Sequence, residues 1–351
     1  FYNDHTLATG SLILVDIDDF KRINDVHGHD IGDMYAYEIA QRIKAKADEF
    51  ALKAYAMDID SFLLLDDGSY NEDKLVSISA KILYEVTKNV RIYDTDHKLT
   101  ASIGIAVKRD ERGMEELYKK VDTALFLAKE RGKNRYVVAS EDEFFAYRKK
   151  QFLNEQLTKE TIQTEIEPFY QPKVDIRDGR LIGVEALARW NSREQGMIYP
   201  KEIIPVLEEN GMLPILDVSI LTKACKTYVE WLDKKLVDKT FIVSCNMSYI
   251  TIAQFDIVAA AIQIHDNIGM PYRSLEIEIK EADFIEHSDE ISDALIELAK
   301  LGVNISIDNF TADKAIMTQI GRLPVNVIKV DKSVLSEGIT KQAREQFDSI
   351  N

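Results

Sequence analysis

The chain has 351 residues, which is long enough for two domains with a hydrophobic core each. Hydrophobic residues make up 46% and charged residues 30%, as in ordinary globular proteins, and the formal net charge is −16. This negative charge argues against a general affinity for DNA or for anionic membranes, so an anionic ligand would need local basic groups or a metal.

The sequence also bears on the cellular compartment. Its two cysteines, Cys225 and Cys245, stand in apolar segments, which argues against a disulfide framework and fits a reducing cytosol. No apolar run has transmembrane length and no signal peptide is visible, so we expect a cytoplasmic location. Because the chain begins at Phe1 rather than at methionine, we expect a fragment. The sequence leaves open an upstream sensory or membrane segment. With a membrane segment, the chain would be the cytoplasmic part of a larger, membrane-anchored protein.

Residues 1–139 alternate strand and helix patterns, which predicts an α+β domain with helices on the faces of a sheet. Strand patterns lie at residues 11–18, 61–65, 99–107 and 136–138, and helical patterns at about 31–50, 72–89 and 114–131. The first strand ends in acidic residues, which include Asp16.

Residues 140–163 contain no Pro, Gly or low-complexity sequence, and they predict one helix that couples two domains. Ser140 is the candidate N-cap. Apolar residues recur at roughly helical spacing from Phe144 to Leu157, and we expect them to pack on the second domain.

The second domain, residues 164–351, opens with two strand patterns joined by a turn at residues 177–180. The second of these strands, LIGVEALARW, carries Glu185 inside a hydrophobic run. Burying a carboxylate is costly unless a metal or a cation pairs with it. On this stretch alone, a metal site and a salt bridge to a neighbouring strand are equally good interpretations.

The later strand patterns also end in polar residues, which are Asn246, Glu278 with Glu281, Asp308 with Asn309, and Lys329 with Asp331. Helical patterns separate these strands, which predicts parallel β/α units. A β/α barrel places its active site at the carboxyl ends of its strands. We therefore expect these side chains to form one site.

Two stretches carry a family resemblance. The segment VEALARW, with the strands that follow it, resembles the EAL family of bacterial cyclic di-GMP phosphodiesterases in motif order and spacing. The segments DIDDFKRINDVHGHDIGD and ALFLAKERGKNR resemble the GGDEF diguanylate cyclase domain. The resemblance implies an α+β GGDEF domain, nucleotidyl-cyclase-like, at residues 1–139, a connector helix at 140–163, and an α/β EAL barrel of the (β/α)8, TIM-like type at 164–351.

The resemblance also implies roles for single residues. The residues at the family's metal positions are Glu185, Asn246, Glu278, Asp308 and Asn309, and the implied cofactor is Mg²⁺ or Mn²⁺. Those at its catalytic positions are Lys329, Glu185 and Asp308. Those at its ligand-binding positions are Gln171, Leu187, Arg189 and Asp331. Glu281 matches the glutamate that supports the loop after the fifth strand. Carboxylate and amide oxygens suit these hard cations, and two of them together hydrolyse phosphodiesters.

The EAL pattern shows departures. Asn309 replaces the second of two adjacent aspartates, and an amide carries no charge and accepts no proton from metal-bound water. The loop at residues 310–313 lacks the family's two glycines, Lys280 replaces a threonine, and Asn326 replaces a frequent aspartate. These changes predict weaker binding of a second metal. The family's late Glu-Gly-Val-Glu segment has no match before Asn351, so we expect the last strands of the barrel to lie beyond this chain.

The GGDEF signature is degenerate, because residues 58–62 read DIDSF. Asp58 adds a negative charge near the expected triphosphate and opposes its binding. The residues retained at the family's metal, guanine and phosphate positions are Asp16 and Asp60, Asn24 and Asp33, and Lys129 and Lys133. Two interpretations stay open: a cyclase fold without cyclase activity that holds a guanine nucleotide, or a scaffold that binds nothing.

These features favour a non-catalytic receptor or regulator in cyclic di-GMP signalling. An active, metal-dependent cyclic di-GMP phosphodiesterase that yields linear pGpG is the alternative, and an interaction scaffold with both sites abandoned is a third. A homodimer is expected by analogy with both families alone.

Overall fold

The computed structural model describes residues 10–108, 113–311 and 323–331, and its internal contacts divide the chain into two compact units, Phe1–Gln151 and Phe152–Asn351. Within the described ranges, no helix is both long enough and apolar enough to cross a membrane.

The first unit is built on a five-stranded sheet with the order β2-β3-β1-β6-β7. Its strands are β1 (Ser11–Ile17), β2 (Lys53–Ala56), β3 (Ser61–Asp66), β6 (Ala101–Ala106) and β7 (Arg135–Val138). A separate two-stranded hairpin comprises β4 (Val90–Ile92) and β5 (Thr95–His97). The helices are α1 (Phe20–His27), α2 (His29–Glu49), α3 (Glu72–Val86) and α4 (Met114–Glu130). The predicted α+β architecture is confirmed.

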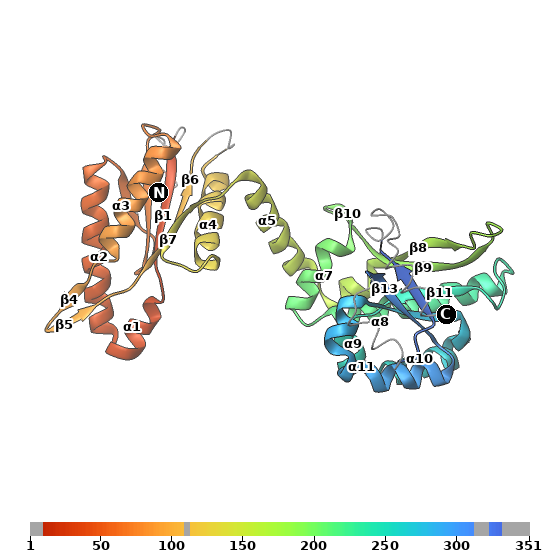
Figure 1. Cartoon of the computed structure of the whole chain (residues 1–351). Coiled ribbons are helices and arrows are strands. Elements are labelled where there is room, and N and C mark those ends of the chain that lie inside the picture. Colours follow the sequence, from red (N-terminus) through yellow and green to blue (C-terminus); the bar gives the residue numbers. More distant parts are fainter. Residues whose placement is uncertain (1–9, 109–112, 312–322, 332–351) are drawn as a thin grey trace, which may run out of the picture. The chain divides into compact units, whose positions relative to one another are not determined.

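Alternation along β1 explains why this sheet is covered on both faces (Figure 1). Ile13, Val15 and Ile17 lie in the core beneath α1, α2 and α3, whereas Leu12 and Leu14 lie in a second core beneath α4. Side chains of a strand alternate between its faces, so a continuous apolar run is what a doubly covered strand requires.

The segment between the domains contains two helices, α5 (Glu141–Gln156) and α6 (Lys159–Thr164), rather than the one that its periodicity predicts. The helical conformation is interrupted at Thr158, which has extended φ/ψ. Thr158 caps α6 by accepting a hydrogen bond from the backbone N–H of Thr161. Leu157, just before the break, is buried in the core of the second unit. A capping threonine therefore ends the first helix before the apolar spacing does.

The second unit contains a seven-stranded sheet with the order β10-β9-β11-β12-β13-β14, in which β8 also pairs with β9. Its strands are β8 (Ile166–Val174), β9 (Leu181–Ser192), β10 (Gly196–Ile198), β11 (Ile242–Asn246), β12 (Leu275–Lys280), β13 (Asn304–Phe310) and β14 (Val327–Val330). Its helices are α7 (Pro200–Glu209), α8 (Leu213–Asp233), α9 (Tyr249–Gln254), α10 (Ile257–Ile268) and α11 (Glu281–Leu301), with a short 3-10 turn η2 (Tyr272–Ser274).

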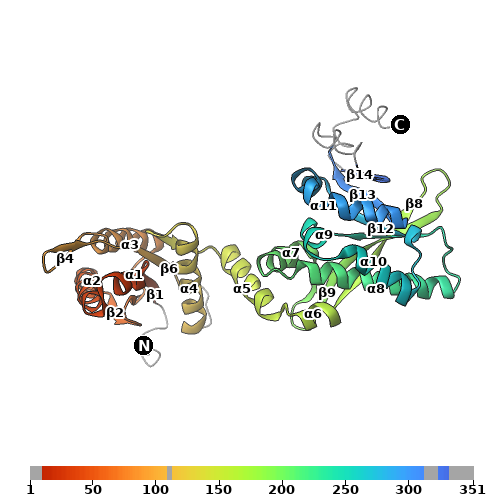
Figure 2. The ribbon, with the colours of Figure 1, turned by 90° about the horizontal axis from the view of Figure 1, so that it is seen from below.

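Pairing in this sheet matches the predicted β/α units. Strands β8 and β9 form an antiparallel hairpin, whereas β9, β11, β12, β13 and β14 pair in parallel. Helices α8 and α11 pack against the sheet (Figures 1 and 2). Any later strands of the barrel fall outside the described residues.

The two faces of this sheet differ in chemistry. One face carries Val184, Val243 and Ile277, which are buried in the helix-packed core. The parallel register aligns Ser244 with both Glu185 and Glu276 on the opposite face. The residues of this opposite face are therefore polar, and the candidate site is built there.

Candidate functional site

The centre of the site is a lysine among carboxylates. The Lys329 Nζ atom lies 2.8 Å from Glu185 Oε2, 2.5 Å from Glu278 Oε2 and 3.1 Å from Asp308 Oδ1. These four residues come from β9, β12, β13 and β14, so the structure brings together four of the polar strand ends that the sequence singles out.

A second lysine approaches the same cluster from β8. The Lys173 Nζ atom lies 2.8 Å from Glu276 Oε1 and 2.8 Å from Glu278 Oε1, and it also donates to the Ser244 hydroxyl. Glu278 is thus held by one lysine at each carboxylate oxygen. We refer to Lys173, Glu185, Glu276, Glu278, Asp308 and Lys329 as the carboxylate–lysine cluster.

The lysines of this cluster neutralise half of its carboxylates. Four carboxylates face two ammonium groups, which gives a formal charge of −2. Burial lowers the pKa of Lys329, but its hydrogen bonds to Glu185 and Glu278 outweigh this effect and raise the pKa above its ordinary value. Lys173 likewise has a raised pKa, because Glu278 and Glu276 outweigh the cost of burial. Both lysines are therefore charged at neutral pH.

The two asparagines at metal positions differ in placement. Asn246, at the end of β11, donates from Nδ2 to Glu185 Oε1 at 2.9 Å and so adjoins the carboxylate–lysine cluster. Asn309 is exposed and has a φ of +56°, and the pairing of β13 with β14 shifts between Ile307 and Phe310. Asn309 therefore lies at an irregularity in the strand, in a conformation that asparagine tolerates better than most residues.

The residues at ligand-binding positions surround the cluster without joining it. Gln171 is exposed and pairs with Glu185 across the hairpin, and the half-buried Leu187 follows on β9. The Arg189 guanidinium lies over the Tyr199 ring, 5.2 Å from its centroid. Asp331 follows β14, and its backbone N–H donates to Phe310 O at 3.0 Å.

Glu281 connects helix α11 to the residue after β13. Its Oε2 atom accepts hydrogen bonds from the backbone N–H and the hydroxyl of Thr311, at 2.8 and 2.6 Å. Ala312 and Asp313, the remaining positions of this loop, lie outside the described residues.

The donor set suits a divalent cation in its chemistry. Carboxylate oxygens from β9, β12 and β13 converge on Lys329, with the Asn246 amide of β11 beside Glu185, and Mg²⁺ and Mn²⁺ prefer carboxylate and amide oxygens. Among the described residues, however, no group of three or more acidic, histidine or cysteine side chains has the spacing of a metal site. The Lys329 ammonium stands between these oxygens, so a divalent cation would bind only as Lys329 moves aside.

The first unit has its own candidate site at the end of β1. Asp16 Oδ1 lies 2.6 Å from Lys129 Nζ, and burial raises the pKa of Asp16 despite that lysine. Asp60 adds a further repulsive charge to Asp16. Lys133 pairs instead with Asp19, at 2.7 Å. The structure therefore brings Asp16, Asp60 and Lys129 together and places Lys133 on a different acid.

The predicted guanine positions lie on α1 and α2. The Asn24 side-chain oxygen is buried and accepts no hydrogen bond from the described residues, and a Cβ at Gly32 would overlap it at 1.8 Å. Asp33 is exposed and lines a cavity of about 400 Å³ with residues of α2 and β4. Between β2 and β3, none of residues 57–60 has positive φ, so the degenerate hairpin forms without glycine.

The sequence-based prediction missed Lys173 and Glu276 in the larger site. Lys173 stands two residues after Gln171 on β8, and Glu276 two residues before Glu278 on β12. Because side chains two apart on a strand share a face, this spacing could have identified both residues. Asp18, one of the acids that end the first strand pattern, received no site role from the sequence; it is buried and accepts hydrogen bonds from Thr100 and Ser102.

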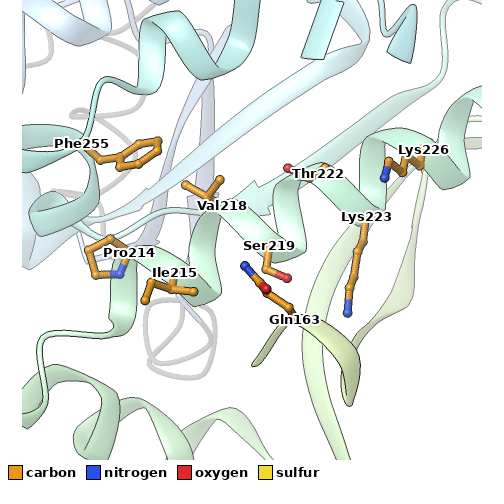
Figure 3. A pocket seen from close by; sticks show the side chains of 9 residues that line it. All are labelled: Gln163, Pro214, Ile215, Val218, Ser219, Thr222, Lys223, Lys226 and Phe255. Atoms are coloured by element: carbon orange, nitrogen blue, oxygen red, sulfur yellow. The ribbon is translucent and has the colours of Figure 1, made fainter. Parts of the chain in front are cut away.

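The second unit also has a groove away from this site, lined mainly by residues of α8. It encloses about 440 Å³, with Pro214, Ile215, Val218 and Phe255 at one end and Lys223 and Lys226 at the other (Figure 3). The groove shares no residue with the carboxylate–lysine cluster.

Family comparison agrees with this architecture. Residues 154–350 match the EAL domain family, and residues 3–135 match the family of the diguanylate cyclase GGDEF domain. The protein belongs to the EAL domain family and carries a GGDEF domain ahead of its EAL domain.

Several characterised proteins are similar to this chain. The bifunctional diguanylate cyclase/cyclic di-GMP phosphodiesterase MucR of Pseudomonas aeruginosa is 28% identical over 331 residues, which cover 93% of this chain and 47% of MucR. The cyclic di-GMP phosphodiesterase PdeR of Escherichia coli is 27% identical over 340 residues, covering 95% of this chain and 50% of PdeR. The chain thus spans about half the length of these relatives.

Among solved structures, the Xanthomonas citri FimX EAL domain in complex with c-diGMP superposes with a TM-score of 0.51 and 13% identity. This match covers 58% of this chain and 79% of the FimX chain, and it supports the fold alone.

Proposed function

We propose that this EAL domain is a cytoplasmic receptor for cyclic di-GMP, which it binds without hydrolysing it efficiently. The observation that carries the proposal is the pairing of the candidate metal ligands with two lysines, since Lys173 holds Glu278 in addition to the contacts of Lys329 with Glu185, Glu278 and Asp308. The carboxylates that would hold metal are already neutralised in part by the chain's own lysines.

The charge of the cluster argues for at most one tightly held divalent cation. One divalent cation balances the formal charge of −2, whereas a second would leave the site strongly positive. The aspartate that would offset half of this excess is replaced by the uncharged Asn309. Phosphodiester hydrolysis by two metals needs one to activate water and both to neutralise the phosphoryl oxygens, so loss of the second impairs the reaction.

Binding cyclic di-GMP does not require the two metal ions that its hydrolysis requires. The Arg189 guanidinium can donate two parallel hydrogen bonds to a phosphate, and its position over Tyr199 limits its freedom. Gln171 is exposed on the strand opposite Glu185 and offers an amide to the ligand. One divalent cation held by Glu185, Asn246, Glu278 and Asp308 would supply positive charge beside the second phosphate.

Calorimetry of this chain with cyclic di-GMP, with and without Mg²⁺, tests the proposal. We expect binding in both conditions, stronger with Mg²⁺, and weaker binding by Arg189→Ala. The absence of binding heat in both conditions would overturn it.

The alternative is a working phosphodiesterase. It is favoured by the convergence of Glu185, Asn246, Glu278, Asp308 and Lys329 on one face of the sheet, and by the activities named for MucR and PdeR. Metal-dependent formation of pGpG that disappears in Glu185→Ala would establish this alternative.

For the GGDEF domain we propose a fold without cyclase activity. Asp16 and Asp60 lie close together, and Asp58 is exposed on the adjoining hairpin, so the site repels a triphosphate unless metal binds. The buried Asn24 side-chain oxygen has no hydrogen-bond partner among the described residues, so we retain a guanine nucleotide as the candidate ligand of this domain.

A further inference from the structure

We propose that Lys173 is a positioning residue of the EAL site, which fixes Glu278 so that a single carboxylate oxygen is presented to a divalent cation. This inference rests on the proposed binding of one cation by Glu185, Asn246, Glu278 and Asp308.

Every donor of the Lys173 ammonium has an acceptor. The group has three N–H donors, and it contacts Glu276 Oε1 and Glu278 Oε1 at 2.8 Å each, together with the Ser244 hydroxyl. Its Cα pairs with that of Gly183 across the hairpin, so the lysine side chain has no bulky cross-strand neighbour there. The ammonium is therefore held by the sheet and is not available to the nucleotide.

The partners of Lys173 are too deeply buried to do without it. The Glu278 side chain is fully buried and that of Glu276 is 3% exposed. An ionised carboxylate at such depth requires a cation. Lys173 serves both carboxylates, whereas Lys329 contacts Glu278 but not Glu276.

The contact of Lys173 also divides the two oxygens of Glu278 between two tasks. Oε1 accepts from Lys173, and Oε2 faces Lys329 at 2.5 Å, where the other candidate ligands converge. When a divalent cation takes the place of the Lys329 ammonium, Glu278 can meet it through Oε2 alone. A lysine that is not itself a ligand thus sets the direction of a ligand, as second-sphere residues do at metal sites.

The test must separate positioning from charge and from folding. Lys173→Met alone would leave the buried Glu276 without a cation and Glu278 with Lys329 alone, and an unpaired buried charge can prevent folding. The double variant Lys173→Met/Glu276→Gln removes one positive and one negative charge, so the cluster keeps its formal charge of −2 and loses only the fixed orientation of Glu278.

Two further variants complete the design. Lys173→Arg keeps the cation and can reach both carboxylates with its fork. Lys223→Met/Glu167→Gln removes another lysine–glutamate pair, between α8 and β8, with a 2.9 Å contact, outside the cluster. It is matched to the test variant in chemistry and in total charge.

The measurement is Mn²⁺ affinity by calorimetry on the full chain without nucleotide, with thermal unfolding as a check of folding. We expect Lys173→Met/Glu276→Gln to bind Mn²⁺ about tenfold or more weakly, as for other second-sphere changes. Lys173→Arg should retain most of the affinity, and Lys223→Met/Glu167→Gln all of it. In EDTA, all variants should bind cyclic di-GMP like wild type, because Lys173 does not face the nucleotide.

Three results would overturn the inference. The first is unchanged Mn²⁺ affinity in the folded Lys173→Met/Glu276→Gln variant, which would make Lys173 a structural ion pair only. The second is loss of cyclic di-GMP binding in EDTA by that folded variant. The third is the absence of Mn²⁺ binding by wild type, which would leave the receptor proposal standing if cyclic di-GMP still binds.

Discussion

Lys329 donates a hydrogen bond to Glu278 across an intervening strand, with Nζ 2.5 Å from Oε2. The lysine stands on β14 and the glutamate on β12, and β13 lies between them in the sheet. The contact therefore closes the polar face over three strands, and it places a permanent cation where the family resemblance implies metal.

Replacing Lys329 by methionine should destabilise the protein and make room for metal. Without the ammonium, Glu185, Glu278 and Asp308 face one another with Lys173, on Glu278, as their remaining cation in the cluster. We expect the free energy of unfolding in EDTA to fall by about 3 kcal/mol, the low end for a broken buried ion pair, because the Lys329 side chain is 25% exposed. Millimolar Mn²⁺ should restore most of this loss, because the cation binds only the folded state. Urea denaturation with and without Mn²⁺ measures both effects, and a loss that Mn²⁺ leaves unchanged would contradict this account.

Asn309→Asp should move the site toward hydrolysis. The substitution adds one negative charge beside Asp308 and a group able to accept a proton from metal-bound water. We expect a second Mn²⁺ to bind and the rate of pGpG formation to rise by at least about tenfold, a change of about 1.4 kcal/mol in barrier. Asn154→Asp, an exposed change on α5 whose side-chain oxygen still accepts the hydrogen bond from Asn210, is the matched control and should have neither effect. Equal rates in wild type and Asn309→Asp would remove Asn309 from the explanation.

Asp217 should make stability depend on pH. This carboxyl is buried on α8, and burial raises its pKa, against smaller lowering effects of hydrogen bonds from Thr251 and Ser248 and of the charge on Lys280. The folded state therefore binds this proton more tightly than the unfolded state, and the stability contribution falls as pH rises from 3.8 to the raised value.

Asp217→Asn removes this titration and keeps an oxygen for the same donors. The free energy of unfolding of the variant, relative to wild type, should increase with pH over that window and then level off. Urea midpoints at a series of pH values provide the test, and a difference that stays constant with pH would contradict it.

Asp58→Gly/Ile59→Gly should strengthen nucleotide binding by the GGDEF domain. Both residues are exposed on the β2–β3 hairpin, and the change removes one negative charge near the expected triphosphate. We expect GTP to bind about fivefold more tightly, which corresponds to about 1 kcal/mol for one charge at about 5 Å in water. Asp67→Gly/Ser69→Gly, at the exposed turn after β3, removes the same single charge and is the control for net charge and added glycines. Equal GTP affinity in all three proteins would mean that the hairpin does not limit binding.

Much of this fold could be predicted from hydrophobic pattern alone. The run at residues 11–17 is apolar on both faces because helices cover both faces of that sheet. Polar residues after Cys245, after Ile277 and after Ile307 indicated one edge of a parallel sheet, since parallel strands end on the same side.

The pairing of charges within the site could not be read in the same way. Lys173 looks like an exposed residue of a hairpin, and only the register of β8 with β9 brings it over Ser244 and Glu276. The break at Thr158 was hidden for a different reason, because a cap competes with a helical pattern that runs on through it. Local sequence determines the helices and strands, whereas the contacts of Lys173 with Glu276 and Glu278 join residues about a hundred positions apart.

The central claim is that this EAL site holds cyclic di-GMP with one divalent cation and does not turn it over efficiently. Native mass spectrometry of the chain with cyclic di-GMP and excess Mn²⁺ counts the metal and identifies the nucleotide in one experiment. We predict a complex of one Mn²⁺ with intact cyclic di-GMP. Two Mn²⁺ ions together with conversion of the nucleotide to pGpG would contradict the account.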